Sequence, residues 1–376
     1  MYIPTTALWK PALWRRKNAR RRRFHDFQNL PPPPRNRTVD LIKTLAIFGV
    51  LLIHTSAGGV SGLEAGSAPW LSNLFWNALA RPAVPLFLMA SGALLLPPER
   101  KLTLKKLYTH NMARLLAALL FWAACYKLVF LALMDSLTPW DLEAAAKNLL
   151  LFRHEEHLYY LHIMLLVYAF LPITRILAGC GDRRLLEYSL TLWLLLGILY
   201  PTVRTLWPFT LLGGIPVQWR MNMTYASIGY TLLGYYLTSV YPRPRRSLCL
   251  LALLAGFLLT FGGTWAASMA AGRPEEHFLE GMGASVFLEA LGIWGLCQSA
   301  SLSERAGRVA AKVSRASFCV FLTHVFFLQL FARHGLRAAA GPVLLTVPLV
   351  STLLLLCGGG TWALLSRVPG VRRWLI

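Results

Sequence analysis

The chain has 376 residues, of which 56% are hydrophobic and 14% are charged. In soluble globular domains roughly a quarter of the residues are charged. The composition therefore excludes that class and predicts an all-α, polytopic membrane protein. The net charge of +22 would suit a nucleic-acid-binding protein. However, the basic residues lie in short segments between apolar stretches, which is the positive-inside pattern of membrane proteins. We therefore predict no nucleic-acid partner.

Residues 1–36 are predicted to form a basic cytoplasmic arm without stable structure. The arm contains Arg20-Arg21-Arg22-Arg23 and ends in Pro31-Pro32-Pro33-Pro34, which cannot continue a helix. The first apolar stretch follows directly, and we expect it to be kept as a membrane helix, not removed as a secretory signal. Membrane lipids are the expected partners of the arm, because anionic headgroups attract clustered arginines.

Ten apolar stretches are each close to the ~20 residues that a helix needs to cross a bilayer. They are residues 41–58, 71–96, 112–133, 158–178, 185–200, 224–240, 247–271, 281–301, 314–333 and 342–365. Together they form one predicted transmembrane domain, residues 37–366, followed by a short basic cytoplasmic tail, residues 367–376. The connection 201–223 contains Trp207 and Trp219 and is expected to dip into the membrane interface.

The loops between these stretches alternate in basic content. The loops on one side, together with both terminal segments, contain 27 Lys and Arg residues, and the loops on the other side contain 7. Because basic loops stay in the cytoplasm, this distribution predicts that both termini are cytoplasmic. A missed span would break the alternation after it, and the alternation holds along the whole chain.

A histidine lies inside the first predicted span. His54 follows Lys43 by eleven positions, and Arg37 and Asp40 precede both at the cytoplasmic end. On a helix, eleven steps leave about 20° between two side chains and about 16 Å along the axis, so Lys43 and His54 share a face. A titratable ring inside the membrane indicates a functional site. The structural alternative is a histidine that only bonds a neighbouring helix.

Charged residues also occur in other spans. Arg81 lies about 15 Å below the outer surface in the second span, where a charge is costly and requires a partner or an anionic ligand. The structural alternative is a salt bridge with Glu289 in the eighth span. Arg114 opens the third span at the cytoplasmic side, where it either binds phosphates or extends to the membrane interface.

Further histidines are predicted near the outer face. His154, His157 and His162 lie in a polar, aromatic segment, but their spacing does not fit His-Glu-x-x-His, and we predict no metal site. Such a rim is typical of a sugar-binding surface or of the aromatic belt at a membrane interface. His324, at mid-depth in the ninth span, is interpreted as a structural histidine.

Motifs in three spans resemble those of a known family. The first span has Arg37-x-x-Asp40-Leu-x-Lys43 and then His54, the second has Arg81-Pro-Ala-Val-Pro-Leu-Phe, and the fourth has Leu158-Tyr-Tyr-Leu-His. This combination resembles the acyltransferase 3 family of bacterial inner-membrane proteins, over about residues 37–366. The pattern is most similar to that of O-acetyltransferases of surface polysaccharides.

The resemblance implies a function. It implies acyl transfer from cytoplasmic acyl-CoA, with acetyl as the commonest group, to a hydroxyl of a cell-surface or lipid-linked glycan at the bacterial inner membrane. His54 matches the essential histidine of the family. Lys43 stands where the family has an arginine for the coenzyme A phosphates, and lysine keeps that charge but lacks the bidentate fork. Asn111 and Arg114 occupy the two positions of an Arg-x-x-Arg motif.

The residues also suit this chemistry by themselves. A hydroxyl that attacks a thioester needs a base that exchanges protons near neutral pH, as histidine does. Positive groups must hold the donor phosphates and offset the charge on the oxyanion, and an acid can orient the imidazole. The predicted catalytic residues are therefore His54, Arg81 and Glu289, and the predicted donor-binding residues are Lys43, Arg114, Asp40 and Arg37.

Two other functions remain open from the sequence. A secondary transporter could use the buried Arg81, His54, Glu289 and His324 as a relay, although the two halves of the chain show no repeat. An inactive relative of the family is the second alternative, because Lys43 and Asn111 depart from the family pattern. Binding of acyl-CoA at the cytoplasmic face would distinguish the enzyme from the transporter.

Overall fold

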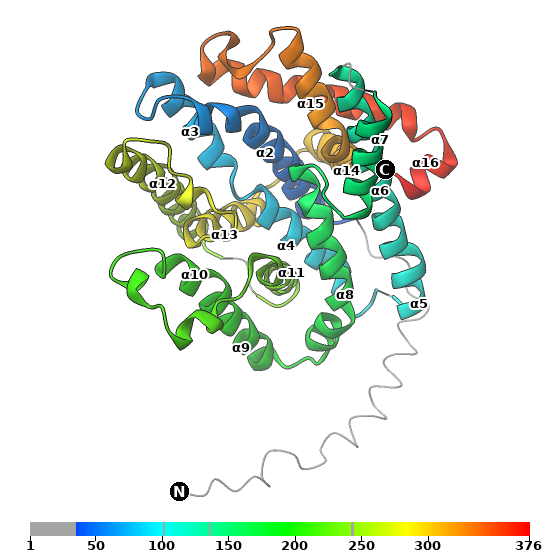
Figure 1. The fold of residues 1–376 in the computed structure, drawn as a ribbon. Coiled ribbons are helices and arrows are strands. Elements are labelled where there is room, and N and C mark those ends of the chain that lie inside the picture. Colours follow the sequence, from blue (N-terminus) through cyan, green and yellow to red (C-terminus); the bar gives the residue numbers. More distant parts are fainter. Residues whose placement is uncertain (1–34, 101, 135–136, 242–243) are drawn as a thin grey trace, which may run out of the picture. The chain divides into compact units, whose positions relative to one another are not determined.

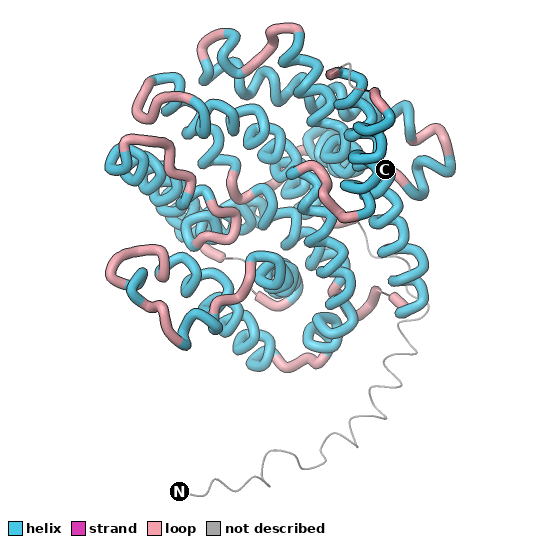
Figure 2. Tube along the Cα trace, in the orientation of Figure 1, coloured by secondary structure: helices cyan, strands magenta, loops and turns pink. Residues whose placement is uncertain are grey.

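The computed structural model describes residues 35–100, 102–134, 137–241 and 244–376 (Figure 1). These residues form helices and loops and contain no strand (Figure 2), so the predicted all-α fold is confirmed. Residues 37–376 form a compact unit. The predicted unstructured arm falls almost wholly on residues 1–34, which lie outside the described residues.

Most of the unit consists of helices longer than ten residues. They are α2 (Arg37–Gly62), α3 (Ala68–Ala80), α4 (Ala83–Leu95), α6 (Ala113–Leu133), α7 (Pro139–Leu150), α8 (Tyr159–Gly179), α9 (Arg183–Trp193), α11 (Met223–Ser239), α12 (Arg246–Ala271), α13 (Ala284–Ser299), α14 (Glu304–Arg333) and α15 (Val343–Leu365). The shorter elements are α5 (Leu104–Lys106), α10 (Tyr200–Val203), α16 (Pro369–Trp374), the π-helices η2 (Leu107–Met112) and η4 (Leu194–Leu199), and the 3₁₀ turns η3 (Glu156–Leu158), η5 (Phe209–Leu211), η6 (Ile215–Trp219), η7 (His277–Leu279) and η8 (Ala338–Ala340).

Helices stand at all ten predicted crossings, and the chain is a multi-pass membrane protein. In the described part of the chain, nine helical segments are long and apolar enough to cross a membrane. The tenth predicted crossing corresponds to α11, whose 17 residues rise about 25 Å, less than the ~30 Å hydrocarbon layer. Ten of these residues are buried, so α11 is covered by protein over most of its length.

The structure differs from the predictions in three segments. Helix α14 begins at Glu304, ten residues before the predicted span, so the basic segment in front of that span is helical as well. The predicted basic tail contains a helix, α16, which the sequence analysis did not identify. The connection 201–223 contains α10 and two 3₁₀ turns and exposes Trp207 and Trp219.

The second crossing is interrupted in its middle. Helix α3 ends at Ala80 and α4 begins at Ala83, with Arg81 and Pro82 between them. Proline has no backbone N–H and clashes with the preceding turn, so it breaks a helix at this position. The interruption leaves Arg81 at the junction of two half-helices.

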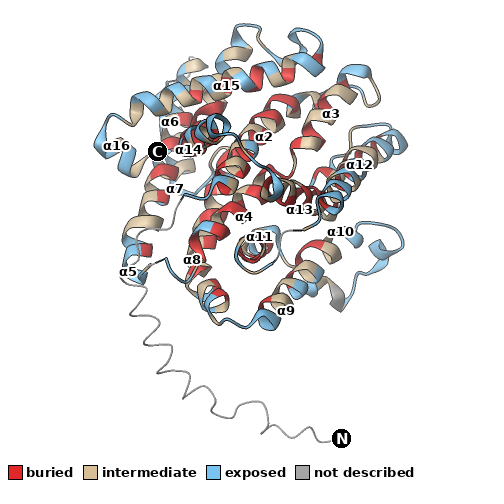
Figure 3. Cartoon of the chain, turned by 180° about the vertical axis from the view of Figure 1, so that it is seen from behind, coloured by how far each residue is buried: buried red, intermediate tan, exposed pale blue. Residues whose placement is uncertain are grey.

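The core of the unit lies along α2 and its neighbours. Helix α2 packs against α3, α4, α14 and α15, and α4 packs against α11. Figure 3 shows the buried residues gathered on α2, α4, α11 and α14, and exposed residues on the outward faces of α12 and α15. The exposed apolar residues of the outer helices suit contact with lipid.

Helices α4 and α11 approach each other through glycine. A Cβ atom added at Gly92 would lie 1.8 Å from the carbonyl oxygen of Thr231, and one added at Gly234 would lie 2.0 Å from that of Met89. Small residues allow such close approach of backbones inside membranes. The two glycines therefore fix the distance between α4 and α11.

Candidate active site

A pocket of about 530 Å³ lies between α2, α4, α6, α8 and α14. Its size is within the range of about 300–1,000 Å³ found for small-molecule sites. The charged and polar residues that line it are Lys43, Ser91, Arg100, Lys106, His110, Asn111, Arg114, Tyr160, Tyr168 and Ser317. The apolar ones are Val50, Val84, Phe87, Leu102, Leu115, Leu161, Met164, Phe318 and Phe321.

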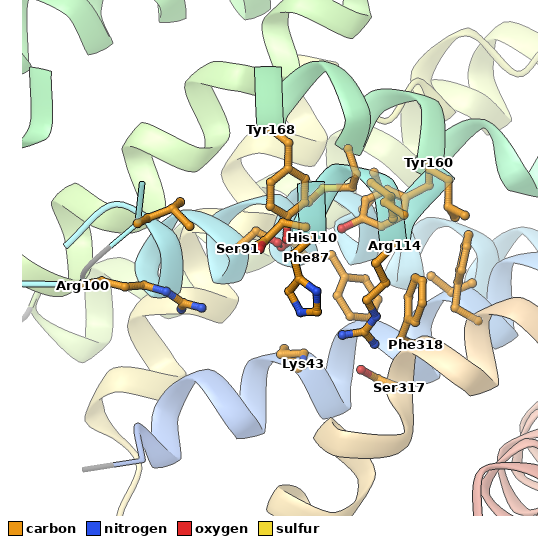
Figure 4. Close-up of a pocket in the computed structure, with 18 of the residues that line it drawn as sticks. Lys43, Phe87, Ser91, Arg100, His110, Arg114, Tyr160, Tyr168, Ser317 and Phe318 are labelled. Atoms are coloured by element: carbon orange, nitrogen blue, oxygen red, sulfur yellow. The ribbon is translucent and has the colours of Figure 1, made fainter. Parts of the chain in front are cut away.

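The end of the pocket predicted to be cytoplasmic is basic. Figure 4 shows Lys43, His110 and Arg114 around a common space, with Arg100 reaching in from the side. The Nζ of Lys43 donates a hydrogen bond to the Ser314 carbonyl, 3.0 Å away. The Arg114 guanidinium donates to the Ile376 carbonyl and lies 5.8 Å from the centroid of the Phe318 ring. This end of the pocket can attract phosphate groups.

A further arginine, which does not line the pocket, supports its basic end. Arg175 on α8 donates hydrogen bonds to the carbonyls of Leu95, at 2.5 Å, and Pro97, at 3.3 Å. It also donates to the Arg100 carbonyl, at 2.5 Å. Cations pair well with the free carbonyls at a helix C-terminus. Arg175 therefore holds the end of α4 and the loop that carries Arg100.

The other end of the pocket is apolar. On α2, Val50 lies seven residues beyond Lys43, or about 10 Å further along the axis. The aromatic rings of Phe87, Tyr160 and Phe321 lie at this end. His54, one helical turn beyond Val50, is not among the lining residues. The pocket thus changes from basic to apolar toward the predicted catalytic histidine.

His54 belongs to a cluster of three histidines. Its ring centroid lies 4.9 Å from that of His324 on α14 and 6.3 Å from that of His157 in η3. The His157 and His324 centroids are 5.3 Å apart. Within the described residues, no group of three or more His, Cys, Asp or Glu side chains is arranged to hold a metal ion.

Hydrogen bonds fix the tautomer of one of these histidines. The Nδ1 of His324 lies 2.7 Å from the Phe321 carbonyl oxygen, which can only accept, so Nδ1 carries the proton of the neutral ring. Its Nε2 is buried without a hydrogen-bond partner, as is the Nε2 of His157. Buried polar atoms are rarely left unpaired, so such atoms at one place indicate a site for a polar group or a proton.

Arg81 interacts electrostatically with His54 and with a group of acidic residues that includes Glu289. The charge of Arg81 acts on His54, and its other electrostatic partners are Tyr159, Glu276, Glu280 and Glu289. The Arg81 Nε is buried without a partner. Among the described residues, none of the ion pairs joins Arg81 to Glu289. The two residues therefore do not form the direct salt bridge that was the structural alternative.

The Glu289 carboxylate is buried on α13. Its Oε1 accepts a hydrogen bond of 2.7 Å from the Thr260 hydroxyl, and its Oε2 has no partner. The rings nearest to His54 are those of His157 and His324, while the described contact of Glu289 is with Thr260. An orienting role of Glu289 for His54 stays a prediction.

The structure brings together only some of the residues predicted for donor binding. Lys43 and Arg114 line one pocket, as expected for a shared ligand. Arg37 is exposed at the start of α2, Asp40 is buried one turn before Lys43, and neither lines the pocket. Their part in donor binding stays a prediction.

Sequence reasoning missed several site residues. It interpreted His157 as part of the outer rim, which is wrong, because this side chain is 4% exposed and lies against His54. It gave His324 a part only in the relay of the alternative transporter, and it did not single out Arg100, Lys106 or His110. The signal for these three was their place in the basic segment before the third span.

The remaining two histidines of the predicted outer rim form a separate pair. His154 Nδ1 and His162 Nε2 are 3.1 Å apart, and His154 Nε2 lies 3.2 Å from the Leu149 carbonyl. Because that carbonyl must accept, His154 is protonated on Nε2, and His162 donates to its Nδ1 when both rings are neutral. This pair stabilises the loop between α7 and α8.

Comparison with known proteins adds one finding. A family model described as an acyltransferase domain matches residues 36–364, which is most of the chain. No curated protein and no solved structure matches the chain.

Proposed function

Because the chain belongs to the acyltransferase 3 family, we propose that this membrane acyltransferase moves an acetyl group from acetyl-CoA to a hydroxyl of a cell-surface or lipid-linked glycan. One observation supports the donor above all: the pocket is basic at one end and apolar at the end nearest His54. Coenzyme A has the same polarity, with phosphates at one end and a thioester at the other.

In this proposal the donor binds from the cytoplasm. The distribution of basic residues places Lys43, Arg100 and Arg114 at the cytoplasmic end of their helices. These cations bind the phosphates, and the pantetheine arm lies along Phe87, Tyr160 and Met164. We propose that the protein lies in the bacterial inner membrane. In that membrane the donor enters from the cytoplasm and the glycan acceptor from the other face.

The chemical step uses the histidine cluster. His54 takes the proton of the acceptor hydroxyl while its oxygen attacks the thioester carbon, which gives a tetrahedral oxyanion. Arg81 offsets the negative charge on that oxygen. The C–S bond then breaks, the acetyl group stays on the acceptor oxygen, and the imidazolium returns its proton to the coenzyme A sulfur.

The direct test is transfer of radiolabelled acetyl-CoA to native surface glycan by the purified protein. Label in the glycan that depends on the protein is expected. Binding of acetyl-CoA without transfer would support the proposed donor and overturn the proposed acceptor. Absence of both would overturn the proposed donor and favour another acyl carrier.

Arg114 provides a second prediction. Replacing Arg114 by glutamine is expected to raise the KM for acetyl-CoA about tenfold or more, with a smaller effect on kcat, because hydrogen bonds to charged groups contribute about 1.5–3 kcal/mol. Acetyl-pantetheine, which lacks the nucleotide phosphates, should show no such change. Steady-state kinetics with both donors measures this difference.

The matched control is Arg273→Gln. Arg273 is exposed and paired with Glu275 outside the pocket, so its loss should leave both KM values unchanged. An equal loss for acetyl-CoA and acetyl-pantetheine in Arg114→Gln would contradict a role in phosphate binding.

A further inference from the structure

Three aromatic rings from three helices line the pocket as one group, and one of them contacts the histidine cluster. The ring centroids of Phe87 on α4 and Tyr160 on α8 are 6.0 Å apart, and those of Tyr160 and Phe321 on α14 are 5.5 Å apart. All three line the pocket, while His54 does not. We call Phe87, Tyr160 and Phe321 the aromatic gate.

The gate touches the cluster on its far side. The Phe321 ring centroid lies 6.1 Å from that of His157 and 6.0 Å from that of His324. Phe321 is therefore in contact with the pocket through one side and with the histidines through the other. At this point Phe321 separates the pocket from the histidines.

The hydroxyl of Ser91 lies next to one ring of the gate. It donates a hydrogen bond of 2.9 Å to the Phe87 carbonyl and is close enough to the Tyr160 hydroxyl to interact with it. Figure 4 shows Tyr160, Phe87 and Ser91 along the same wall of the pocket.

We infer that the aromatic gate sets the length of the acyl group that this enzyme transfers. The inference rests on the proposed acyl-CoA donor. The two-carbon acetyl group passes between the rings, and each further methylene must displace a ring that is packed on both sides. Protein interiors are close-packed and resist such displacement. The gate is thus a specificity determinant, and His54 remains the group that touches the reacting atoms.

The first test measures donor preference. Phe321→Ala and Phe87→Ala are expected to raise the ratio of kcat/KM for hexanoyl-CoA to that for acetyl-CoA at least tenfold, since one methylene in an apolar pocket changes this ratio about 10–200-fold. Phe121→Ala is the control, because Phe121 is exposed on α6 outside the pocket. Its ratio should equal that of the wild type. An unchanged ratio in both gate variants would overturn the inference.

A second test does not depend on catalysis. In a chain whose six native cysteines are replaced by alanine, His54→Cys is treated with a bulky maleimide from the cytoplasmic side of inverted vesicles. The reaction is expected to be at least tenfold faster when Phe321 or Phe87 is also replaced by alanine, and unchanged with Phe121→Ala. Equal rates in all variants would overturn the gate. If the variants of the first test, which retain His54, transfer no acyl group but the gate variants react faster here, the proposed donor fails, while the rings are still shown to restrict access to His54.

Discussion

Replacing His54 by alanine is expected to lower kcat for acetyl transfer by a factor of about 10²–10⁴, the range that a general base contributes. In the proposed mechanism, the imidazole removes the hydroxyl proton beyond the apolar end of the pocket. Its neighbours within 6.3 Å are two further histidine rings. The KM for acetyl-CoA should change little, since the proposal places the phosphates at the other end of the pocket.

The assay needs a histidine control. His277→Ala removes a histidine of turn η7 that does not line the pocket and has no ring contact with His54, His157 or His324, and should retain full transfer. Folding of each variant is checked by its melting temperature in detergent. Full transfer by a folded His54→Ala protein would remove His54 as the base and direct attention to His157 or His324.

Replacing Gly92 by alanine is expected to destabilise the protein by about 3 kcal/mol, at the upper end of the 1–3 kcal/mol typical of overpacking. The new methyl group would lie 1.8 Å from the Thr231 carbonyl oxygen, so α4 and α11 would have to separate. A backbone carbonyl cannot rotate away as the end of a flexible side chain can. The melting temperature in detergent measures the loss.

A matched glycine shows whether the effect comes from packing. A Cβ added at Gly359 on α15 meets no atom within 4 Å. Alanine has a higher helix propensity than glycine by about 1 kcal/mol, so Gly359→Ala should melt at the same or a higher temperature. Equal melting temperatures for Gly92→Ala and Gly359→Ala would contradict the close contact of α4 and α11.

The sequence predicted those parts of the site that lie on one helix. Lys43 and His54 are eleven residues apart, and helical periodicity alone places them on one face. The basic end of the pocket was predictable in part, because the segment before the third span is rich in Lys and Arg. The fold class followed from ten apolar stretches and the alternation of basic loops.

The contacts between helices were not predictable in this way. His157 and His324 lie 103 and 270 positions after His54, and no periodicity relates residues on separate helices. Their contact depends on how η3 and α14 pack against α2. The interlocking glycines of α4 and α11 depend on packing in the same way, since each contacts a carbonyl of the other helix.

Helix α11 has a further consequence for how the protein is made. Nine of its 17 residues are Ser, Thr or Tyr and two are Gly, a composition that gains little from lipid. When the ribosome delivers this segment to the translocon, insertion into lipid alone is weakly favoured compared with a run of Leu and Ile. Helix α4 is synthesised earlier and presents the surface that fits Gly234. The part of the chain that is made earlier therefore provides the packing partner for this polar crossing.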